Sequence, residues 1–299
     1  MPTPMHDEEI PVDHDLVHRL VDSQFPHLAD RSLRRLEPWG TDNAIFRLGD
    51  DLVVRLPRIH WATDQVDKEA TWLPRLAPHL TVGVPEPVAI GEPDHGYPHR
   101  WAVNRWLPGE LAGPDTITDP NRFAEDLART VIELRGVPTD GAPSATSRAR
   151  PIAEYDGATR RAIAGAARLI DTVGATEIWE AALAAPRHDG PPVWVHGDLE
   201  GNCLLTDGRL SGLVDWGSAC AGDPAVDVQV VWSPLFTEAS RARFLDLVEA
   251  DDATVARAKG AAVNQACAAL PYYRHTYPLI VERSEHKLRT LGVDVRLAP

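Results

Sequence analysis

Residues 193–227, VWVHGDLEGNCLLTDGRLSGLVDWGSACAGDPAVD, hold most of the polar side chains that point to a particular chemistry. Residues 193–195 are apolar and lead to the first acidic residue of the stretch, Asp198. A second apolar run leads to Asp215. Short apolar runs of this kind are typical of buried strands, so each carboxylate is expected just beyond a rigid strand, where it can face a cleft.

The oxygen-bearing side chains of this stretch suit phosphoryl transfer. Asn202 and Asp215 offer a carbonyl and a carboxylate oxygen, the ligands that Mg²⁺ takes in proteins together with substrate phosphates. Asp198 is then left to accept a proton from a substrate hydroxyl. We expect Asp198 to act as the base and Asn202 and Asp215 to bind the metal ion.

The order and spacing of these residues resemble the aminoglycoside phosphotransferase family, relatives of protein kinases that phosphorylate small molecules. In that family the HGD motif supplies the catalytic aspartate, and a later asparagine and aspartate bind magnesium. The resemblance implies these roles for Asp198, Asn202 and Asp215, with ATP or GTP as the phosphate donor. The matching residues are His196-Gly197-Asp198, Asn202, Asp215-Trp216-Gly217, Gly222-Asp223-Pro224-Ala225 and Asp227.

The first half of the chain resembles the same family more faintly. Kinase-like folds pair a basic residue on the third strand with a glutamate on a helix. The strand here is LVVRLPR at residues 52–58, and the helix contains DKEA at residues 67–70. The resemblance implies that Arg55 contacts the nucleotide phosphates and that Glu69 holds it. It also implies a loop above the phosphates at Gly40, Thr41 and Asn43, and a hinge that meets the purine ring at Arg105, Trp106 and Leu107.

The first departure from the family is that the usual strand lysine is absent, since no lysine precedes Lys68. Arg55 stands in its place, and arginine is permanently charged and can grip phosphates through a planar fork. The run RLPR at residues 55–58 resembles the macrolide-phosphorylating branch.

The second departure is the length of the catalytic loop. Asp198 and Asn202 are four residues apart, one fewer than in the kinase pattern. Either Gly201 lets the shorter loop close more tightly, or the geometry of the metal site is altered.

Other polar residues near the motif have both structural and functional interpretations. We expect His196 to anchor the loop through hydrogen bonds. Asp223 precedes Pro224 and is expected to cap a helix. Asp227, one turn later, is expected to favour the N-terminus of that helix electrostatically, although both aspartates could instead be substrate ligands. Glu200 lies inside the loop and either meets a cationic substrate or is exposed without function.

The pattern and the resemblance together imply a two-lobed, protein-kinase-like α+β fold with the active site between the lobes. Residues 1–106 are expected to form a nucleotide-binding lobe, a small antiparallel sheet with one main helix. Residues 107–299 are expected to form a mostly helical lobe with the catalytic loop and the acceptor site. Strands are expected at 32–38, 43–48, 51–56, 88–91, 101–106, 203–205 and 210–214. Helices are expected at 12–25, 63–76, 121–135, 152–173, 176–184 and over most of 225–291, with breaks at Pro234, Pro271 and Pro278.

The charge balance bears on the partners of the protein. The 44 acidic and 30 basic residues give a net charge of −14, which disfavours nucleic acid and anionic membranes as partners. Residues 110–228 carry 19 acidic and 10 basic residues, a net charge of −9. This acidity suits a polycationic acceptor such as an aminoglycoside-type antibiotic. The alternative interpretation is an acidic surface that serves solubility.

Other acceptors and another class of protein stay open. A macrolide is the near alternative, favoured by the RLPR run, and choline, homoserine or a sugar is a third. A catalytically silent pseudokinase that only binds nucleotide is the alternative from a different class. The three cysteines have no metal-ligand or disulfide-framework spacing, and residues 1–15 lack a basic and then apolar leader, so we expect a cytoplasmic location with the oligomeric state open.

Overall fold

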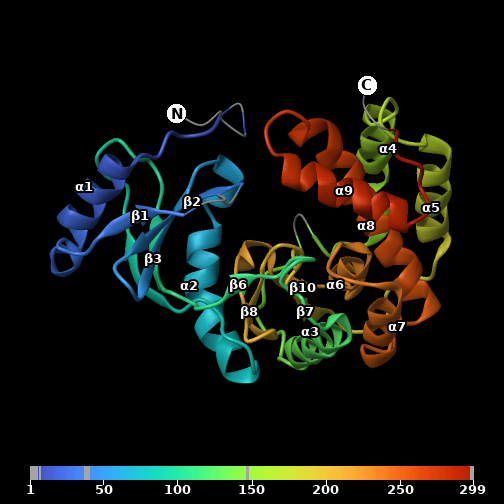
Figure 1. Ribbon diagram of the computed structural model, residues 1–299, viewed down its shortest axis with the longest axis horizontal. Helices are drawn as coiled ribbons and strands as arrows, with labels where there is room; N and C mark the ends of the chain where they lie inside the picture. The colour runs from blue at the N-terminus through green and yellow to red at the C-terminus, as the bar shows by residue number, and fades with distance from the viewer. Residues whose placement is uncertain (1–5, 7, 37–40, 146–147, 297–299) are drawn as a thin grey trace. The chain divides into compact units, whose positions relative to one another are not determined.

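The computed structural model describes residue 6 and residues 8–36, 41–145 and 148–296 (Figure 1). The chain divides into two compact units. Unit 1 comprises residues 1–78 and 83–108, and unit 2 comprises residues 79–82 and 109–299. The sequence predicts a boundary between residues 106 and 107, and the structure has it just after Pro108, with a short earlier segment assigned to unit 2.

Unit 1 is built on a five-stranded antiparallel sheet of order β1-β2-β3-β5-β4. The turn at Gly49, with φ +60°, joins β2 to β3 in a hairpin. The strands are β1 (Leu33–Arg35), β2 (Asn43–Leu48), β3 (Leu52–Pro57), β4 (Pro87–Gly91) and β5 (Trp101–Arg105). The helices are α1 (His14–Gln24) and α2 (Gln65–Leu76), with single 3-10 turns at η1 (Pro26–Leu28), η2 (His60–Ala62) and η3 (Ala77–His79).

Strand alternation explains how β3 presents Arg55. Side chains at alternate positions of a strand point to opposite faces. Leu52, Val54 and Leu56 share one face and pack in the core with Leu20 of α1. Arg55 therefore points to the opposite face, where it meets the helix α2.

Unit 2 is mainly helical. Its strands are β6 (Glu110–Leu111), β7 (Val193–Val195), β8 (Cys203–Thr206), β9 (Arg209–Leu213) and β10 (Cys220–Gly222). Its helices are α3 (Pro120–Arg135), α4 (Asp156–Gly165), α5 (Thr172–Ala184), α6 (Ala225–Val228), α7 (Glu238–Leu247), α8 (Asp252–Tyr273) and α9 (Pro278–Thr290). Single 3-10 turns lie at η4 (Ile152–Tyr155), η5 (Trp216–Ser218) and η6 (Gln229–Trp232). In the part of the chain that the structure describes, no helix is both long and apolar enough to cross a membrane.

The strands of unit 2 form small sheets that carry the loops of interest. β7 pairs antiparallel with β10, and β8 pairs antiparallel with both β6 and β9. The turn between β8 and β9 has two residues of positive φ, Asp207 and Gly208, as a tight hairpin requires. A separate apolar core, with Trp179 of α5 and Val263 of α8 fully buried, holds α4, α5, α8 and α9 together.

The break between two expected helices lies earlier than predicted. The sequence predicts helices over 152–173 and 176–184, but α4 ends at Gly165 and α5 begins at Thr172. Asp171 explains the restart, because its carboxylate accepts hydrogen bonds from Val173 N (3.0 Å) and Gly174 N (3.0 Å). These are N-cap bonds, which satisfy amides that have no partner inside a helix.

Replacing Asp171 with alanine is expected to lower the free energy of unfolding by about 1 kcal/mol, because the two cap bonds are lost. For a protein of this size that corresponds to a fall in Tm of about 2 °C, measurable by differential scanning calorimetry. The control is Asp189→Ala in an exposed loop, which should not move Tm. Equal midpoints for both variants would contradict the capping role.

A second correction concerns Pro271. The sequence predicts a helix break there, but α8 runs through it to Tyr273. Proline in a helix removes one backbone hydrogen bond, and here the loss falls close to the end of α8. The helix continues because Cys267 and Leu270 remain buried against neighbouring helices. Pro278 instead occupies the first position of α9, where a missing N–H costs nothing.

Candidate active site

Asp198 lies in a loop that follows β7, a strand whose Trp194 and Val195 are buried. β10 fixes this strand in register, with Val195 opposite Cys220. Because these two apolar residues are buried in the core, the strand is held in place and the loop begins at a fixed position. Asp198 itself is about one third exposed, at 33%, and can therefore meet a ligand.

The buried carboxylate of Asp227 fixes the start of this loop. Its side chain is 2% exposed and accepts hydrogen bonds from the backbone N–H groups of His196 (2.8 Å) and Gly197 (2.8 Å). Burial raises the pKa of the Asp227 carboxyl, and the two amide hydrogen bonds and the guanidinium of Arg135 oppose that rise. Asp227 thus holds the loop across about 30 residues of sequence, a role that the sequence analysis does not predict for it.

His196 ties the loop to the end of the second strand. Its Nε2 lies 3.1 Å from Val214 O, and its Nδ1 lies 3.3 Å from the backbone N of Asp198. A carbonyl can only accept and an amide N–H can only donate, so these partners select the neutral ring with its proton on Nε2. The ring also packs on Trp216, with 4.7 Å between ring centroids. His196 is fully buried, an arrangement that anchors the loop.

Asn202 and Asp215 lie beside Asp198. The Asn202 side chain donates from Nδ2 to Asp198 O (2.7 Å), and its backbone O accepts from Val214 N (2.9 Å). Asp215 follows directly in the left-handed region with φ +59°, a strained conformation for a residue with a Cβ. Gly201 adopts φ +85°, which closes the shortened loop as its glycine allows.

The surroundings of the Asp198 carboxylate tune its basicity. Burial raises the pKa of the Asp198 carboxyl, the guanidinium of Arg148 offsets part of this rise, and Asp215 adds to it. Arg148 Nη2 lies 3.8 Å from Asp198 Oδ1, and Gln265 Nε2 lies 3.4 Å from the same oxygen. A carboxylate with a raised pKa is a better proton acceptor than an ordinary exposed aspartate.

Two acidic residues that the sequence offers as substrate ligands have partners inside unit 2. Glu200 lies 2.7 Å from Lys287 Nζ, in a nearly buried ion pair. Asp223 accepts from Arg257 Nε (2.8 Å) and from Ala225 N (2.9 Å). The charge of Glu200 is thus compensated by Lys287. Asp223 contacts the first residue of α6, but the N-cap position expected for it is occupied by Pro224, which makes no side-chain cap bond.

In unit 1, Arg55 sits in a buried polar cluster with α2. Its guanidinium is hydrogen-bonded to Glu69 and donates from Nη2 to Gln65 Oε1 (3.0 Å). Turning the Asn43 amide lets its oxygen accept from Nη2 (3.0 Å) and Nε (3.2 Å) of Arg55. The structure therefore brings three of the expected nucleotide-binding residues into one cluster: Arg55, Glu69 and Asn43.

The other expected nucleotide-binding residues are placed as follows. The backbone N–H of Arg105 donates to Glu86 O (2.8 Å), and that of Trp106 donates to Asp51 O (2.8 Å). These two amides are occupied within unit 1, whereas the N–H of Leu107 has no hydrogen bond among the described residues. His6 Nε2 lies 3.1 Å from the backbone oxygen of Thr41. Gly40 lies outside the described residues.

A model of the phosphotransferase enzyme family matches residues 33–262, well over half of the 299 residues of the chain. This chain belongs to the phosphotransferase enzyme family. The match spans both the Arg55 cluster and the loop of Asp198, and it confirms the resemblance drawn from the motifs. No curated protein matches the sequence of this phosphotransferase.

Solved structures with the same fold are similar over nearly the whole chain. The GDP complex of wild-type aminoglycoside 2′-phosphotransferase-IIIa has a TM-score of 0.73 at 20% identity, over 94% of this chain and 99% of that one. The macrolide 2′-phosphotransferase MphH from Brachybacterium faecium has a TM-score of 0.61 at 24% identity, over 94% and 97%. A streptomycin–ATP complex of APH(2″)-IIa has a TM-score of 0.61 at 18% identity, over 86% and 90%. These likenesses confirm the kinase-like α+β fold of the phosphotransferase.

Sequence reasoning missed three residues that surround the loop of Asp198 in this phosphotransferase: Arg148, Gln265 and Lys287. Gln265 is 67 residues from Asp198 in sequence, and Lys287 donates to Gln265 Oε1 (2.8 Å) as well as pairing with Glu200. One signal was available, because Lys287 is one of only three lysines in the chain. The scarcity of lysine could have drawn attention to Lys287, but it does not identify the residue that Lys287 contacts.

Proposed function

We propose that this phosphotransferase moves the γ-phosphate of ATP or GTP to a hydroxyl group of a small molecule. The observation that carries the proposal is Asp198, a half-buried carboxylate of raised pKa beside Asn202 and Asp215. Asp198 accepts the proton of the acceptor hydroxyl while the oxygen of that hydroxyl bonds to the γ-phosphorus. The bond from that phosphorus to the β–γ bridging oxygen breaks, and the nucleoside diphosphate leaves with the electron pair.

The donors beside Asp198 fit a magnesium ion. Asn202 uses its Nδ2 on the loop backbone, which leaves its carbonyl oxygen for another partner, and Asp215 adds a carboxylate. Oxygen donors of this kind are what Mg²⁺ takes, with the remaining positions filled by phosphate and water. When bound, Mg²⁺ would neutralise charge that develops on the phosphates. Asn202 and Asp215 are the residues that would hold it.

We assign nucleotide contacts in unit 1 to Arg55, positioned by Glu69, and to the backbone at Leu107. Arg55 presents a permanent positive charge for the phosphates, and its pairing with Glu69 fixes the direction of the guanidinium fork. The N–H of Leu107 is a donor suited to the edge of a purine. Relatives of this fold are described in complex with GDP and with ATP, which supports a nucleotide as the donor.

The double variant Arg55→Met/Glu69→Gln is expected to raise the nucleotide KM about 10-fold or more, because a charge-assisted contact to phosphate is lost. Both charges are removed together, since Arg55→Met alone would take the positive charge away from the buried Glu69 carboxylate, at a cost of about 3–5 kcal/mol. Steady-state kinetics with ATP and with GTP measure the effect, and Arg19→Met on the exposed face of α1 is the control. A nucleotide KM equal to that of the wild type would remove Arg55 from the nucleotide site.

The acceptor is proposed to be an antibiotic-like small molecule, with aminoglycosides as the first candidates and macrolides as the second. Relatives of the fold are described as complexes with kanamycin, streptomycin and gentamicin, and another as a macrolide 2′-phosphotransferase. The acidity of residues 110–228 supports the first class. We also propose a cytoplasmic location, in keeping with cysteines that are all buried.

The test is mass spectrometry of acceptor pools incubated with the protein, ATP or GTP and Mg²⁺. Phosphotransfer predicts a phosphate adduct on an acceptor and consumption of nucleotide, both absent with Asp198→Ala. A pseudokinase would instead bind nucleotide, seen as a thermal shift, and give no adduct in any pool. Nucleotide binding without turnover would therefore overturn the proposed function.

A further inference from the structure

A buried lysine lies close to the loop of Asp198 and has no place in the proposed phosphotransfer. Lys287, on α9, is 3% exposed. Lysine side chains are almost never fully buried unless they are paired, because the ammonium group loses its hydration there. The next residue, Leu288, is fully buried in the core that joins α8 and α9, so packing fixes the position of Lys287. The contacts that Lys287 makes from this position therefore decide its role.

Both partners of the Lys287 ammonium lead to Asp198. Its Nζ lies 2.7 Å from Glu200 Oε2 and donates to Gln265 Oε1 at 2.8 Å. Glu200 is two residues after Asp198 in the same loop. Its other oxygen, Oε1, is buried and has no hydrogen-bond partner among the described residues, so Lys287 compensates this carboxylate. Lys287 thus joins α9 both to the loop and, through Gln265, to α8.

The ammonium of Lys287 determines the direction of the Gln265 amide. An ammonium group can only donate hydrogen bonds, and a carboxylate can only accept them. The amide oxygen of Gln265 must therefore face Lys287, and its Nε2 then faces Asp198 Oδ1 at 3.4 Å. With the amide turned the other way, two donors would meet at Lys287 and two acceptors would meet at Asp198. Both ends of the network thus require the same orientation of Gln265.

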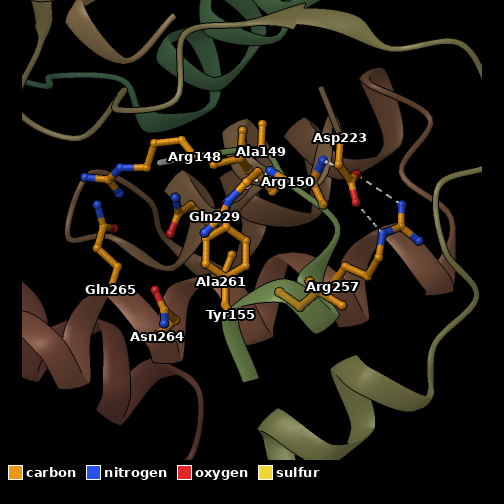
Figure 2. Close-up of a pocket in the computed structure, with 13 residues that line it drawn as sticks. Arg148, Ala149, Arg150, Tyr155, Asp223, Gln229, Arg257, Ala261, Asn264 and Gln265 are labelled. Atoms are coloured by element: carbon orange, nitrogen blue, oxygen red, sulfur yellow. Dashed lines mark hydrogen bonds and ion pairs between the residues drawn. The ribbon is translucent and has the colours of Figure 1, made fainter. Parts of the chain in front are cut away.

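The contacts to the Asp198 carboxylate fall on one of its two oxygens. Gln265 Nε2 and Arg148 Nη2 both approach Oδ1, at 3.4 Å and 3.8 Å. Figure 2 shows these two side chains among the residues that line a pocket in unit 2, with their polar ends close together. In the described part of the chain, no residue forms a hydrogen bond or an ion pair with Oδ2. Oδ2 is therefore the oxygen that is left to accept a proton.

We propose that Gln265 is a positioning residue that holds Asp198 through Oδ1, so that Oδ2 faces the acceptor hydroxyl, and that Lys287 keeps Gln265 in this orientation. The inference rests on the proposed function and adds two residues to it. A carboxylate that is held presents its basic oxygen to the hydroxyl without first having to be oriented, which lowers the barrier. No bond to Gln265 or Lys287 forms or breaks in the reaction. Because the inference concerns the base, it applies to an aminoglycoside and to a macrolide alike.

Two substitutions of Gln265 test the hydrogen bond to Asp198. Gln265→Met keeps the length of the side chain and removes the amide, whereas Gln265→Glu keeps the shape and an acceptor for Lys287 but offers Asp198 no donor. Both variants should lower kcat by about 10- to 100-fold, because the base is no longer held. The KM values for nucleotide and acceptor should stay within about twofold of the wild type. Steady-state kinetics, with the acceptor that mass spectrometry identifies, measure these constants. An unchanged kcat, or a loss that appears in KM instead, would overturn the proposal.

Lys287 is tested together with its ion partner. Lys287→Met/Glu200→Gln removes both charges at once, so that no buried carboxylate loses its cation. This variant should lower kcat by about 10-fold, with both KM values retained. Adding Gln265→Met should lower kcat by no more than about a further twofold, because Lys287 acts through Gln265. Losses that multiply in the triple variant would contradict the role assigned to Lys287.

Two matched controls lie on α8. Asn264, the neighbour of Gln265, donates to Thr159 Oγ1 at 2.6 Å. Asn264→Ala should lower Tm and keep its kcat, which separates a loss of stability from a loss of positioning. Lys259→Met removes an exposed lysine and should change neither Tm nor kcat. A loss of kcat in Asn264→Ala equal to that in Gln265→Met would show a merely structural role and overturn the proposal.

The outcome also separates this inference from the proposed function. If the wild type transfers phosphate and both Gln265 variants keep its kcat, the inference fails and the proposed function stands. If the wild type transfers phosphate to no acceptor, the proposed function fails, and the inference fails with it.

Discussion

Replacing Asp198 with asparagine is expected to lower kcat by about 10²- to 10⁴-fold while the protein stays folded and still binds nucleotide. The amide cannot take up the proton of an acceptor hydroxyl, although it fills the same space. Asn202 bonds to the backbone oxygen of Asp198 and not to its carboxylate, so the loop geometry should persist. Steady-state kinetics give kcat, and a thermal shift with ADP checks nucleotide binding. A kcat within about threefold of the wild type would remove Asp198 from the chemistry.

The same variant should be more stable than the wild type near neutral pH. Burial raises the pKa of Asp198 in the folded protein above its unfolded value. Such a group favours folding below the unfolded pKa, near 4, and this contribution is lost as pH rises through the folded pKa. Asparagine carries no charge, so the Tm of Asp198→Asn should exceed that of the wild type at pH 8, and the difference should shrink toward pH 4. The control is Asp207→Asn in the exposed β8–β9 turn, where no such difference is expected.

The raised pKa also predicts the pH profile of the reaction. Asp198 must be ionised to accept a proton, so kcat/KM should fall as pH drops through its pKa in the free enzyme. Because burial raises that pKa, the acid limb should lie above the ordinary aspartate value of about 3.9. A profile of kcat/KM between pH 4 and pH 9 measures the limb. An acid limb at or below the ordinary value would contradict the burial of this carboxylate.

The parts of the site that follow from sequence are those joined over short stretches of chain. Asp198 and Asn202 lie in one loop. The β8–β9 hairpin begins directly after this loop, and Asp215 follows the hairpin. Motif spacing is therefore enough to predict that these three residues lie close together. Arg55 and Glu69 are 14 residues apart, on a strand and the next main helix, which is close enough for pattern reasoning to pair them. Periodicity likewise predicts β2 without error and places α1, α2 and α3 to within two residues at each end.

The parts that do not follow from sequence depend on contacts between distant segments. Gln265 reaches Asp198 across 67 residues, and Arg257 reaches Asp223 across 34. Neither pairing leaves a local pattern, since each depends on how α8 packs in unit 2. Composition is limited for a related reason: the net charge of residues 110–228 does not tell which of those charges line a pocket. Local rules also overstate the effect of Pro271 on the helix, because the tertiary packing of α8 outweighs one lost hydrogen bond.

Asp227 combines a local sequence position, at the start of a helix, with a contact to a distant segment of the chain. Its replacement has the second large expected effect. Asp227→Ala would leave the backbone N–H groups of His196 and Gly197 without their acceptor in a buried place. An unsatisfied buried donor costs about 1–3 kcal/mol, so the two together should lower the free energy of unfolding by about 2–5 kcal/mol. Urea unfolding measures this loss. The freed loop should also lower kcat by about 10²-fold, because Asp198 is no longer held in place.

A matched variant separates this anchoring role from a helix-terminus effect. Asp252 is an exposed acid in the first turn of α8 and has the electrostatic position that the sequence suggests for Asp227 in α6. Asp252→Ala should cost only about 0.3–1 kcal/mol and leave kcat unchanged. If Asp227→Ala cost no more than Asp252→Ala and kept its kcat, the carboxylate would act only on its own helix. A loss several times larger, with kcat reduced and nucleotide binding retained, would show that the catalytic loop depends on a residue about 30 positions further along the chain.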